Sequence, residues 1–567
     1  MSKPLIIQSD SSVLLEVNNP DFENARDSIS PFAELQKSPE HIHTYRISPL
    51  SLWNAAATGL KTQDIVSRLK EYSRYEIPEV VITSIKEQMG KYGLLKLVVK
   101  DEDIILTSED AAILNEITGN KKASAFLEER LDENNVKIKK LYRGHLKQAL
   151  IKIGFPVEDL AGYEKGDPCS IGTKETAASG LSFTVRDYQM SAVNAFYRGG
   201  GPEGGSGIIV LPCGSGKTIV GIALMELLQT QTLILVTNTI AIRQWKDELL
   251  DKTDLTSDMI GEFSGEKKEI KPVTIATYNI LTYRKRKTDN FIHFNLFSSR
   301  NWGLIIYDEV HLLPAPVFRI TSEIQSRRRL GLTATLIRED GLETDVFSLI
   351  GPKKFDMPWK VLEKSNWIAM ALCTEIRIPL PYDLRIRYSV SKDKEKFRTS
   401  SENPEKTAMV KRILDYHAGA SVLVIGQYIS QLEDFAAAFN LMLITGSTPI
   451  AEREDLYKKF KSGEIKILVV SKVANYSIDL PDANVAIQIS GTFGSRQEEA
   501  QRLGRILRPK KGENTAYFYT IVSANTIEET FAHNRQLYLT EQGYSYTILN
   551  EEMFWKKFGA EKYSSNA

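Results

Sequence analysis

The amino-acid sequence predicts an α/β protein in which two parallel sheets, each flanked by helices, follow one another along the chain. From residue 207 onward, short apolar runs alternate with helical segments, as in GIIVLPCG, TLILVTN, VTIATY, LIIYDE and LGLTAT. Short runs of Ile, Leu and Val are typical of strands buried on both faces of a parallel sheet. The same rhythm returns after residue 420 in SVLVIG, LMLITG, IKILVVSK, VAIQIS and TAYFYTIV, which indicates a second sheet of this kind.

The composition is that of an ordinary globular protein with no overall charge. The 567 residues are 42% apolar and leave room for several domains. Basic and acidic residues number 72 each, so any contact with nucleic acid must come from local clusters. The three cysteines are too few for a four-cysteine metal site. The N-terminus lacks the order of a signal peptide and no apolar run reaches membrane-spanning length, which predicts a cytoplasmic protein without a membrane partner.

An accessory region with both helices and strands precedes the first sheet. Apolar residues recur at helical spacing in LSLWNAAATG, TQDIVSRLKEY, PEVVITSIKEQMGKYG and RGHLKQALIKIGF, whereas LLKLVVKDEDIILTS alternates as strands do. The segment KGDPCSIGTKETAASG at 165–180 is rich in small and polar residues, which predicts a linker ahead of the sheet domains.

The strongest chemical motif is LPCGSGKT, which lies between the strand GIIVL and the helix TIVGIALMELLQ. Glycines permit a loop whose backbone N–H groups point inward at a triphosphate, and the following helix adds partial positive charge. We expect Lys217 to reach the β- and γ-phosphates and Thr218 to bind Mg²⁺. The complete motif would have glycine at position 211, where this chain has Leu211, so a purely structural loop is the alternative. The predicted phosphate loop comprises Gly214, Ser215, Gly216, Lys217 and Thr218.

The second motif is LIIYDEVH, in which a buried strand ends at Asp308 and Glu309. A carboxylate at the tip of a neighbouring strand suits Mg²⁺, so we assign Asp308 to the metal. Glu309 is then placed to orient or deprotonate the attacking water. The alternative is a solvated acidic turn. That explanation is poor, because the preceding run LIIY is strongly apolar.

A row of arginines in QRLGRILRPKK is the third element. Arg502, Arg505 and Arg508 recur every three residues, which suits one face of a helix. The row could be a solvated basic face. It could also provide a cation that stabilises the transferring phosphoryl group. We therefore assign Gln501, Arg505 and Arg508 to catalysis from the second sheet domain.

The motif series resembles helicase superfamily two and, more narrowly, the bacterial and archaeal branch of the XPB family. The resemblance rests on FTVRDYQ, LVTNTIAIRQW, TIATYN, GLTATLIRED, SKVANYSIDLP, GSRQEEAQRLGRILR and RQLYLTEQGYSYTIL. It covers residues 180–550 closely and 1–165 more loosely. It implies two tandem RecA-like domains that bind ATP and Mg²⁺.

The resemblance also assigns residues to ligands. It implies adenine contacts at Arg186 and Gln189, and a further nucleotide contact at Asp479. Arg338, Glu339 and Asp340 look like the RED tripeptide that marks XPB proteins. The resemblance implies that these three residues contact DNA. It implies the same for Thr237, Asn238, Arg243, Thr277, Tyr278, Ser471 and Lys472.

The resemblance further suggests how the chain is divided. The expected parts are an XPB-like accessory domain (1–98), a damage-recognition-like domain (99–165), a linker (166–180), the first RecA-like domain (181–355), a segment with a thumb-like insertion (356–405), the second RecA-like domain (406–550) and a tail (551–567). Two basic clusters, YRKRK at 283–287 and SRRRL at 326–330, are either solvated faces or DNA contacts.

These observations predict an ATP-dependent DNA helicase or translocase. Its 3′→5′ polarity and a role in repair come from the resemblance. A translocase that moves on duplex without separating it, a motor on RNA and a nucleotide-gated interaction protein remain alternatives. Archaeal relatives work with a nuclease, so a nuclease or another repair protein is the implied partner, and the chain is expected to act as a monomer or in a hetero-complex.

Overall fold

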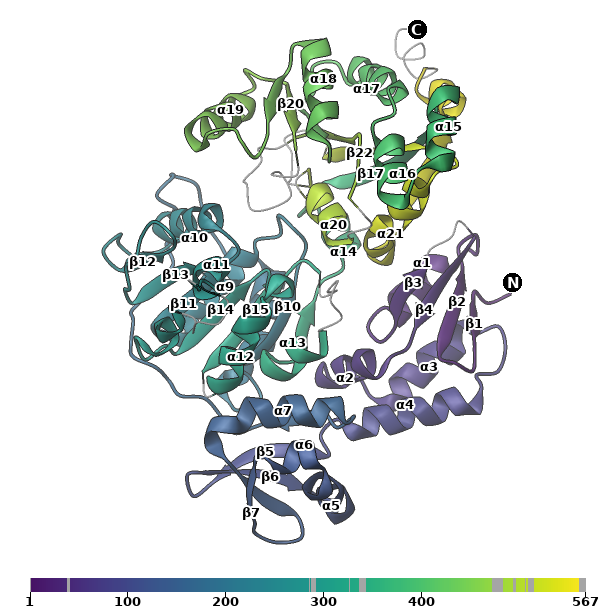
Figure 1. The fold of residues 1–567 in the computed structure, drawn as a ribbon. Coiled ribbons are helices and arrows are strands. Elements are labelled where there is room, and N and C mark those ends of the chain that lie inside the picture. Colours follow the sequence, from purple (N-terminus) through teal and green to yellow (C-terminus); the bar gives the residue numbers. More distant parts are fainter. Residues whose placement is uncertain are drawn as a thin grey trace. The chain divides into compact units, whose positions relative to one another are not determined.

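The computed structural model describes residues 2–559 apart from 38–40, 285, 287–291, 326, 336–342, 472–482, 493–495, 505 and 508–513. The chain divides into two compact units (Figure 1), which are Met1–Leu211 with Gly216–Met357, and Pro212–Ser215 with Pro358–Ala567. Within the described ranges, no helix is long and apolar enough to cross a lipid bilayer.

The first unit is built around a seven-stranded sheet in the order β12-β13-β11-β14-β15-β10-β16. Every pairing in it is parallel, as the apolar runs predict. The central strands are buried along almost their whole length, which is why they carry no alternating polar residues. The strands are β10 (Ser206–Val210), β11 (Thr232–Val236), β12 (Ile260–Phe263), β13 (Val273–Thr277), β14 (Leu304–Asp308), β15 (Arg328–Thr333) and β16 (Lys353–Asp356).

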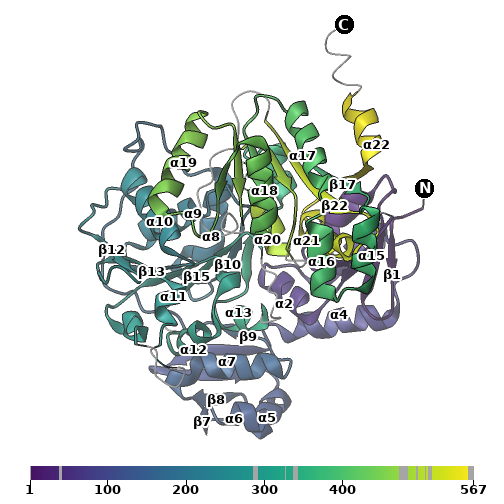
Figure 2. The same cartoon turned by 45° about the horizontal axis from the view of Figure 1, so that its top comes forward.

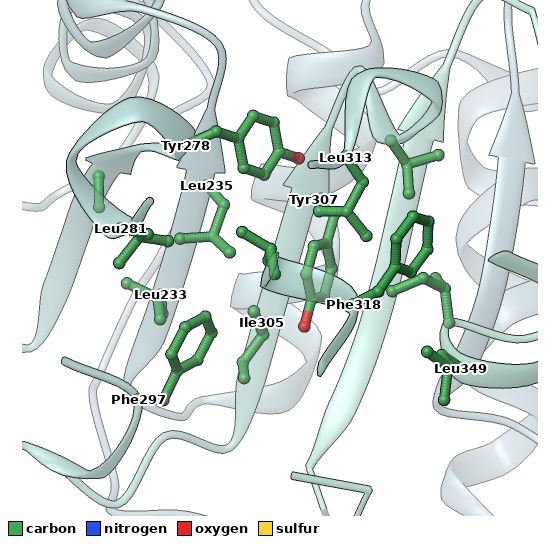
Figure 3. Close-up of a cluster of buried hydrophobic side chains, with 14 of the residues drawn as sticks. Leu233, Leu235, Tyr278, Leu281, Phe297, Ile305, Tyr307, Leu313, Phe318 and Leu349 are labelled. Atoms are coloured by element: carbon green, nitrogen blue, oxygen red, sulfur yellow. The ribbon is translucent and has the colours of Figure 1, made fainter. Parts of the chain in front are cut away.

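Helices cover both faces of this sheet. On one face α9 contacts β14, β15 and α10. On the other face, side chains from α11, α12 and α13 pack on Leu235, Ile305 and Tyr307 in one apolar cluster (Figure 3). The helices are α8 (Asp187–Tyr197), α9 (Lys217–Leu228), α10 (Thr239–Lys252), α11 (Tyr278–Leu281), α12 (Ala315–Glu323) and α13 (Glu343–Leu349), with short 3-10 turns at Arg198–Gly200, Phe294–Ser298 and Val310–Leu312.

The accessory region contains two smaller sheets that the sequence shows less clearly. An antiparallel sheet in the order β1-β2-β4-β3 precedes α2, and a second sheet in the order β7-β8-β6-β5-β9 surrounds the predicted hairpin. The strands are β1 (Leu5–Ile7), β2 (Ser12–Glu16), β3 (Glu34–Lys37), β4 (Ile42–Arg46), β5 (Leu95–Lys100), β6 (Asp103–Ser108), β7 (Leu127–Arg130), β8 (Asn135–Ile138) and β9 (Val157–Asp159).

The four predicted accessory helices are all present. They are α2, α3, α4 and α7, and α7 contacts both α12 and α13 of the sheet domain. The helices of this region are α1 (Phe22–Ile29), α2 (Pro49–Ala57), α3 (Thr62–Tyr72), α4 (Glu79–Lys91), α5 (Ala111–Gly119), α6 (Lys121–Ser124) and α7 (Arg143–Lys152), with a 3-10 turn at Lys140–Tyr142.

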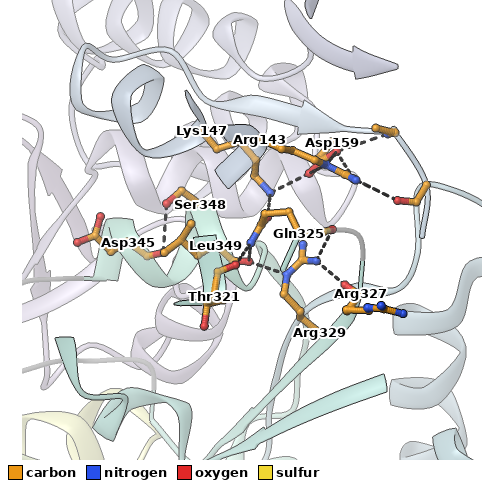
Figure 4. A network of polar contacts seen from close by, with 12 residues as sticks. Arg143, Lys147, Asp159, Thr321, Gln325, Arg327, Arg329, Asp345, Ser348 and Leu349 are labelled. Atoms are coloured by element: carbon orange, nitrogen blue, oxygen red, sulfur yellow. Dashed lines mark hydrogen bonds and ion pairs between the residues drawn. The ribbon is translucent and has the colours of Figure 1, made fainter. Parts of the chain in front are cut away.

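A buried polar network joins the accessory region to the first sheet domain (Figure 4). Asp159 accepts hydrogen bonds from Arg143 (2.6 Å) and Lys147 (2.9 Å), and Lys147 also donates to Gln325 Oε1 (2.9 Å). Gln325 belongs to the segment between α12 and β15, where Arg329 donates to its carbonyl (2.7 Å). Asp159 is therefore the counter-charge of the buried Arg143 and Lys147, as the low dielectric of an interior requires.

The second unit contains the other predicted parallel sheet, in the order β19-β20-β18-β21-β22-β17-β23. Its core joins the strands to α17, α18 and α22. The strands are β17 (Met370–Ile378), β18 (Val422–Ile425), β19 (Met442–Ile444), β20 (Ile467–Val470), β21 (Val485–Gln488), β22 (Thr515–Ser523) and β23 (Tyr546–Asn550).

Two helices follow β17 before the rest of the second sheet begins. These are α15 (Tyr382–Val390) and α16 (Asp393–Ser401), which contact each other (Figure 2) and correspond to the segment expected to form a thumb-like insertion. The remaining helices are α14 (Trp359–Lys364), α17 (Glu405–Tyr416), α18 (Ile429–Phe439), α19 (Ile450–Ser462), α20 (Arg496–Gly504), α21 (Ile527–Glu541) and α22 (Glu551–Phe554), followed by a π-helical turn at Trp555–Gly559.

Candidate active site

The glycine-rich loop joins β10 to α9 and curves as a phosphate cradle does. Gly214 and Gly216 have φ angles of 78° and 85°, in the left-handed region that favours glycine. A Cβ atom on Gly216 would lie 2.4 Å from Nε2 of Gln189, so a side chain there is excluded. Helix α9 begins directly at Lys217, and its first N–H groups therefore follow the loop.

The loop lysine faces the acidic end of the neighbouring strand. Lys217 Nζ lies 3.8 Å from Oε1 of Glu309, and both side chains are largely buried, with 11% and 22% of their surfaces exposed. Lys217 Nζ also approaches the carbonyl of Leu211 at 3.5 Å. The LPCGSGKT and LIIYDEVH motifs, which are far apart in the sequence, thus meet at one edge of the first sheet.

Asp308 is held in a fixed orientation at the end of β14. Its Oδ2 accepts a 2.9 Å hydrogen bond from Nε1 of Trp245, and its Oδ1 accepts one of 3.0 Å from the backbone N–H of Glu309. Burial of the carboxylate, together with the charge of Glu309, raises the pKa of Asp308 to about 6. An oriented carboxylate whose charge is poorly solvated is well suited to a bound cation.

Trp245 reaches Asp308 because α9 and α10 approach each other closely. A Cβ atom on Gly221 of α9 would lie 2.6 Å from the Trp245 ring, which is itself buried. Sequence analysis did not identify Trp245 as part of the site. The available signal is a glycine in the middle of an apolar helix, since such a glycine often marks close packing.

A histidine connects the acidic motif to β15. His311 Nδ1 lies 3.4 Å from Oε2 of Glu309 and 2.7 Å from Oγ1 of Thr333. Thr333 Oγ1 in turn donates to the carbonyl of Thr335 at 2.5 Å. Glu309 is therefore linked through His311 to the TAT segment, and sequence analysis missed this link as well.

The predicted adenine-contacting segment adjoins the phosphate loop. Gln189 is buried, and its Oε1 accepts a 2.9 Å hydrogen bond from the backbone N–H of Arg186. Arg186 Nη1 donates to the hydroxyl of Tyr188 at 3.2 Å. Gln189 also adjoins Gly216, the last loop residue before α9.

The residues predicted to contact DNA in the first unit fall into two groups. Arg243 is exposed on α10, Thr237 is half-buried, and Asn238 caps that helix by accepting from Ile240 and Ala241 N–H (both 3.0 Å). Thr277 and Tyr278, in contrast, are buried.

The contacts of these two buried residues explain their placement. Tyr278 donates its hydroxyl to the carbonyl of Asp308 (2.9 Å), and Thr277 Oγ1 accepts from Ile280 N–H (3.4 Å) at the start of α11. Their assignment to DNA stays a prediction, and both side chains pack within the first unit.

Of the arginine row in the second unit, the structure describes Arg502. Helix α20 ends at Gly504, and Arg502 is fully buried, where its guanidinium donates to Gln488 and lies 3.6 Å from Glu498. The catalytic roles of Arg505 and Arg508 stay predictions. Ser471 is buried and donates its N–H to Ile444 (3.0 Å). Gln501 lies in α20, whereas Arg338, Glu339, Asp340, Lys472, Asp479, Arg505 and Arg508 lie outside the described residues.

Three family models match this chain. They are described as "ERCC3/RAD25/XPB C-terminal helicase" (residues 362–567), "Type III restriction enzyme, res subunit" (182–338) and "Helicase conserved C-terminal domain" (5–132).

Similar proteins match over nearly their full length. A "DNA 3'-5' helicase XPB" of Kineococcus radiotolerans is 51% identical over 97% of both chains, and one of Mycobacterium tuberculosis is 52% identical over 96% of this chain and 97% of its own. A "General transcription and DNA repair factor IIH helicase/translocase subunit XPB" of Enterocytozoon bieneusi is 34% identical over 96% of this chain and 92% of its own. With its phosphate loop, acidic strand end and these relatives, the chain belongs to the XPB family of helicases.

Proposed function

We propose that the chain is an ATP-dependent DNA 3′→5′ helicase that converts ATP hydrolysis into strand separation. The observation that carries this proposal is the meeting of Lys217 with the acidic pair Asp308 and Glu309 at one edge of a parallel sheet. The names of the bacterial relatives, both DNA 3'-5' helicases, support the choice of DNA and the polarity.

The triphosphate is bound by the glycine-rich loop. Its backbone N–H groups and the start of α9 provide donors for the β- and γ-phosphates, and Lys217 adds a positive charge. In the structure Lys217 lies beside Glu309, so nucleotide binding exchanges that carboxylate for a phosphate oxygen. Arg186 and Gln189, adjoining Gly216, hold the adenine.

Asp308 and Thr218 fit a magnesium ion. The raised pKa of Asp308 reflects an anion that the protein solvates poorly, and a divalent cation offsets this cost. When bound, Mg²⁺ neutralises charge on the phosphates. Trp245 keeps the Asp308 carboxylate in the orientation that binding requires.

Glu309 positions and deprotonates the attacking water. Its Oε1 lies 3.8 Å from Nζ of Lys217, and its Oε2 lies 3.4 Å from Nδ1 of His311. Through His311 and Thr333, a change at Glu309 reaches the end of β15, directly before the RED tripeptide. We propose that this link transmits the state of the nucleotide to the DNA-binding surface.

The second RecA-like domain completes the machinery. By family resemblance, Gln501, Arg505 and Arg508 stabilise charge on the transferring phosphoryl group, and Asp479 contributes to nucleotide binding. An arginine acting in this way is typically worth ~10³ to 10⁵ in rate. We propose strand separation by Arg338, Glu339 and Asp340. The proposed DNA contacts are Thr237, Asn238, Arg243, Thr277, Tyr278, Ser471 and Lys472.

The proposal is tested by ATP turnover with and without DNA. Strong stimulation by single-stranded DNA is expected from a motor, whereas equal turnover without nucleic acid would favour a nucleotide-gated interaction protein. Stimulation by duplex together with displacement of a bound third strand, but no separation of the duplex, would favour a double-strand translocase. Stimulation by RNA alone would indicate a motor on RNA.

We further propose that the chain acts in DNA repair in the cytoplasm, with a nuclease or another repair protein as partner. The name of the microsporidian relative, a transcription and DNA repair factor subunit, supports this role. Two measurements test this role. One is the sensitivity of a deletion strain to ultraviolet light, and the other is co-purification of a nuclease with the chain.

A further inference from the structure

A cavity of about 150 Å³ lies in the first unit, between the accessory region and the first sheet. Its walls come from α2, α7, β9, the turn after α8, and β16. Ser206, which begins β10, lines the cavity, whereas the phosphate loop follows the other end of that strand. Five residues of strand span about 17 Å, so the cavity is separate from the candidate active site.

Charged side chains line this cavity without pairing fully. Lys354 Nζ donates to the carbonyl of Glu203 (3.0 Å) and makes no further hydrogen bond or ion pair with residues in the described ranges. An ammonium group has three donors, so two remain available. Burial and the charge of Arg198 lower the pKa of Lys354 to about 8, which indicates a poorly compensated cation.

An uncompensated carboxylate lines the same cavity. The side chain of Glu158, on β9, forms no hydrogen bond or ion pair within the part of the chain that the structure describes. Glu158 and Lys354 are near enough to influence each other electrostatically, yet their charged atoms are not within 4.0 Å. The cavity thus presents Lys354 and Arg198, the latter 3.6 Å from the Glu203 carboxylate, together with the separate carboxylate of Glu158.

The rest of the lining is rigid and partly apolar. Ile151, Phe347 and Pro352 provide apolar surface. Lys147 and Asp159 also line the cavity, but they pair with each other at 2.9 Å in the buried network of Figure 4. A pocket with apolar walls and a few convergent polar groups is the usual form of a small-molecule site.

We propose that the cavity binds a small zwitterion of the α-amino-acid class with an apolar side chain. Its carboxylate would bind Lys354 and Arg198, and its ammonium group Glu158. Its side chain would pack against Ile151 and Phe347. A cavity of 150 Å³ is the size that accepts one benzene-sized molecule, which admits leucine and excludes a nucleotide. A simple anion fits less well, because the carboxylates of Glu158 and Glu203 line the same space.

The experiment uses the full chain and L-leucine as the probe, with binding followed by calorimetry and by ligand-observed NMR. Two analogues each lack one charge, namely 4-methylpentanoate without the ammonium group and isopentylamine without the carboxylate. Inorganic phosphate tests for a simple anion site. We expect saturable binding of leucine, with both analogues and phosphate binding at least tenfold more weakly.

Matched variants locate the binding. Lys354→Gln and Glu158→Gln should each weaken leucine binding at least tenfold. Lys122→Gln on α6 and Glu116→Gln on α5, which are exposed, should leave it within twofold. Lys354→Met provides a second test of the same position, and its melting temperature is expected to stay close to wild type, because Lys354 is only half-buried and loses a single hydrogen bond. Lys217→Ala should bind leucine normally, so the result is independent of the ATP site.

Three results would overturn the proposal. Absence of saturable leucine binding by the folded wild-type chain would identify the cavity as a water site. Binding of phosphate or 4-methylpentanoate as tightly as leucine would make it an anion site. Unchanged leucine binding in folded Lys354→Gln and Glu158→Gln variants would place the ligand elsewhere on the molecule.

Discussion

Trp245 donates the hydrogen bond of its indole N–H to Oδ2 of Asp308 at 2.9 Å, and so fixes the carboxylate at the end of β14. The tryptophan comes from a helix that follows a different strand, and its ring packs on Gly221. A residue that itself reaches no ligand thereby determines how the acidic motif is presented.

Replacing Trp245 by Phe should lower ATP turnover about tenfold while the protein stays folded. Phe lacks the indole atoms Cη2 and Cζ3 that pack on Gly221, and the hydrogen bond to a charged group, worth about 1.5–3 kcal/mol, is lost as well. The Mg²⁺ concentration for half-maximal turnover should rise, because Asp308 is no longer oriented.

Trp302→Phe is the matched control, since Trp302 Nε1 donates to the Leu296 carbonyl (3.0 Å) outside the candidate site. Its turnover should stay close to wild type. Equal losses in both variants would show that Trp245 acts through stability alone.

Glu309→Gln should bind ATP but hydrolyse it at least ~10²-fold more slowly, in the range that loss of general-base catalysis typically costs. Lys217→Ala should instead weaken ATP binding, because the phosphate loop loses its charge. Fluorescent-nucleotide binding and single-turnover hydrolysis separate the two effects. Normal hydrolysis by Glu309→Gln would mean that another group activates the water.

Asp159→Asn should destabilise the first unit by about 3–5 kcal/mol, since it leaves Arg143 and Lys147 buried without their counter-charge. Asp103→Asn, which breaks a more exposed 2.9 Å pair with Lys137, should cost less than about 1 kcal/mol. Urea unfolding of the two variants provides the comparison. Similar small losses would show that the network contributes little to holding the accessory region.

The free energy of unfolding should rise with pH between about 8 and 10.5 because of Lys147. Burial lowers the pKa of Lys147 to about 8 in the folded protein, whereas its ordinary value is 10.5. Between these values the unfolded chain binds more protons, so higher pH favours the folded state, by at most about 1.4 kcal/mol per pH unit. Lys147→Met should lose this part of the slope, and parallel curves for the two proteins would contradict the assignment.

The parallel sheets were predictable because buried strands carry continuous apolar runs, as LIIYD in β14 does. The phosphate loop and the Asp308–Glu309 pair were equally visible, since both follow such strands directly. Strand β17 was missed because its sequence, MALCTEIRI, mixes apolar and polar residues. Its Glu375 is buried, where it accepts from Gln536 (2.7 Å), a partner that no local pattern reveals.

The contacts of Trp245, His311 and Tyr278 could not be predicted for a related reason. Each contact depends on which helix or strand lies beside β14. The spacing of residues along the chain does not indicate which elements become neighbours. The burial of Arg502 was hidden from the sequence for the same reason, because its partner Gln488 lies on another element of the second sheet domain.

The proposed motor is tested most directly by measuring strand separation with the full chain, ATP and Mg²⁺. The substrates are 3′-tailed, 5′-tailed and blunt duplexes, and Glu309→Gln is the blank. We predict that the wild-type chain separates the 3′-tailed duplex fastest and that Glu309→Gln separates none. Separation that is equally fast with Glu309→Gln, or that prefers the 5′ tail, would contradict the proposed function.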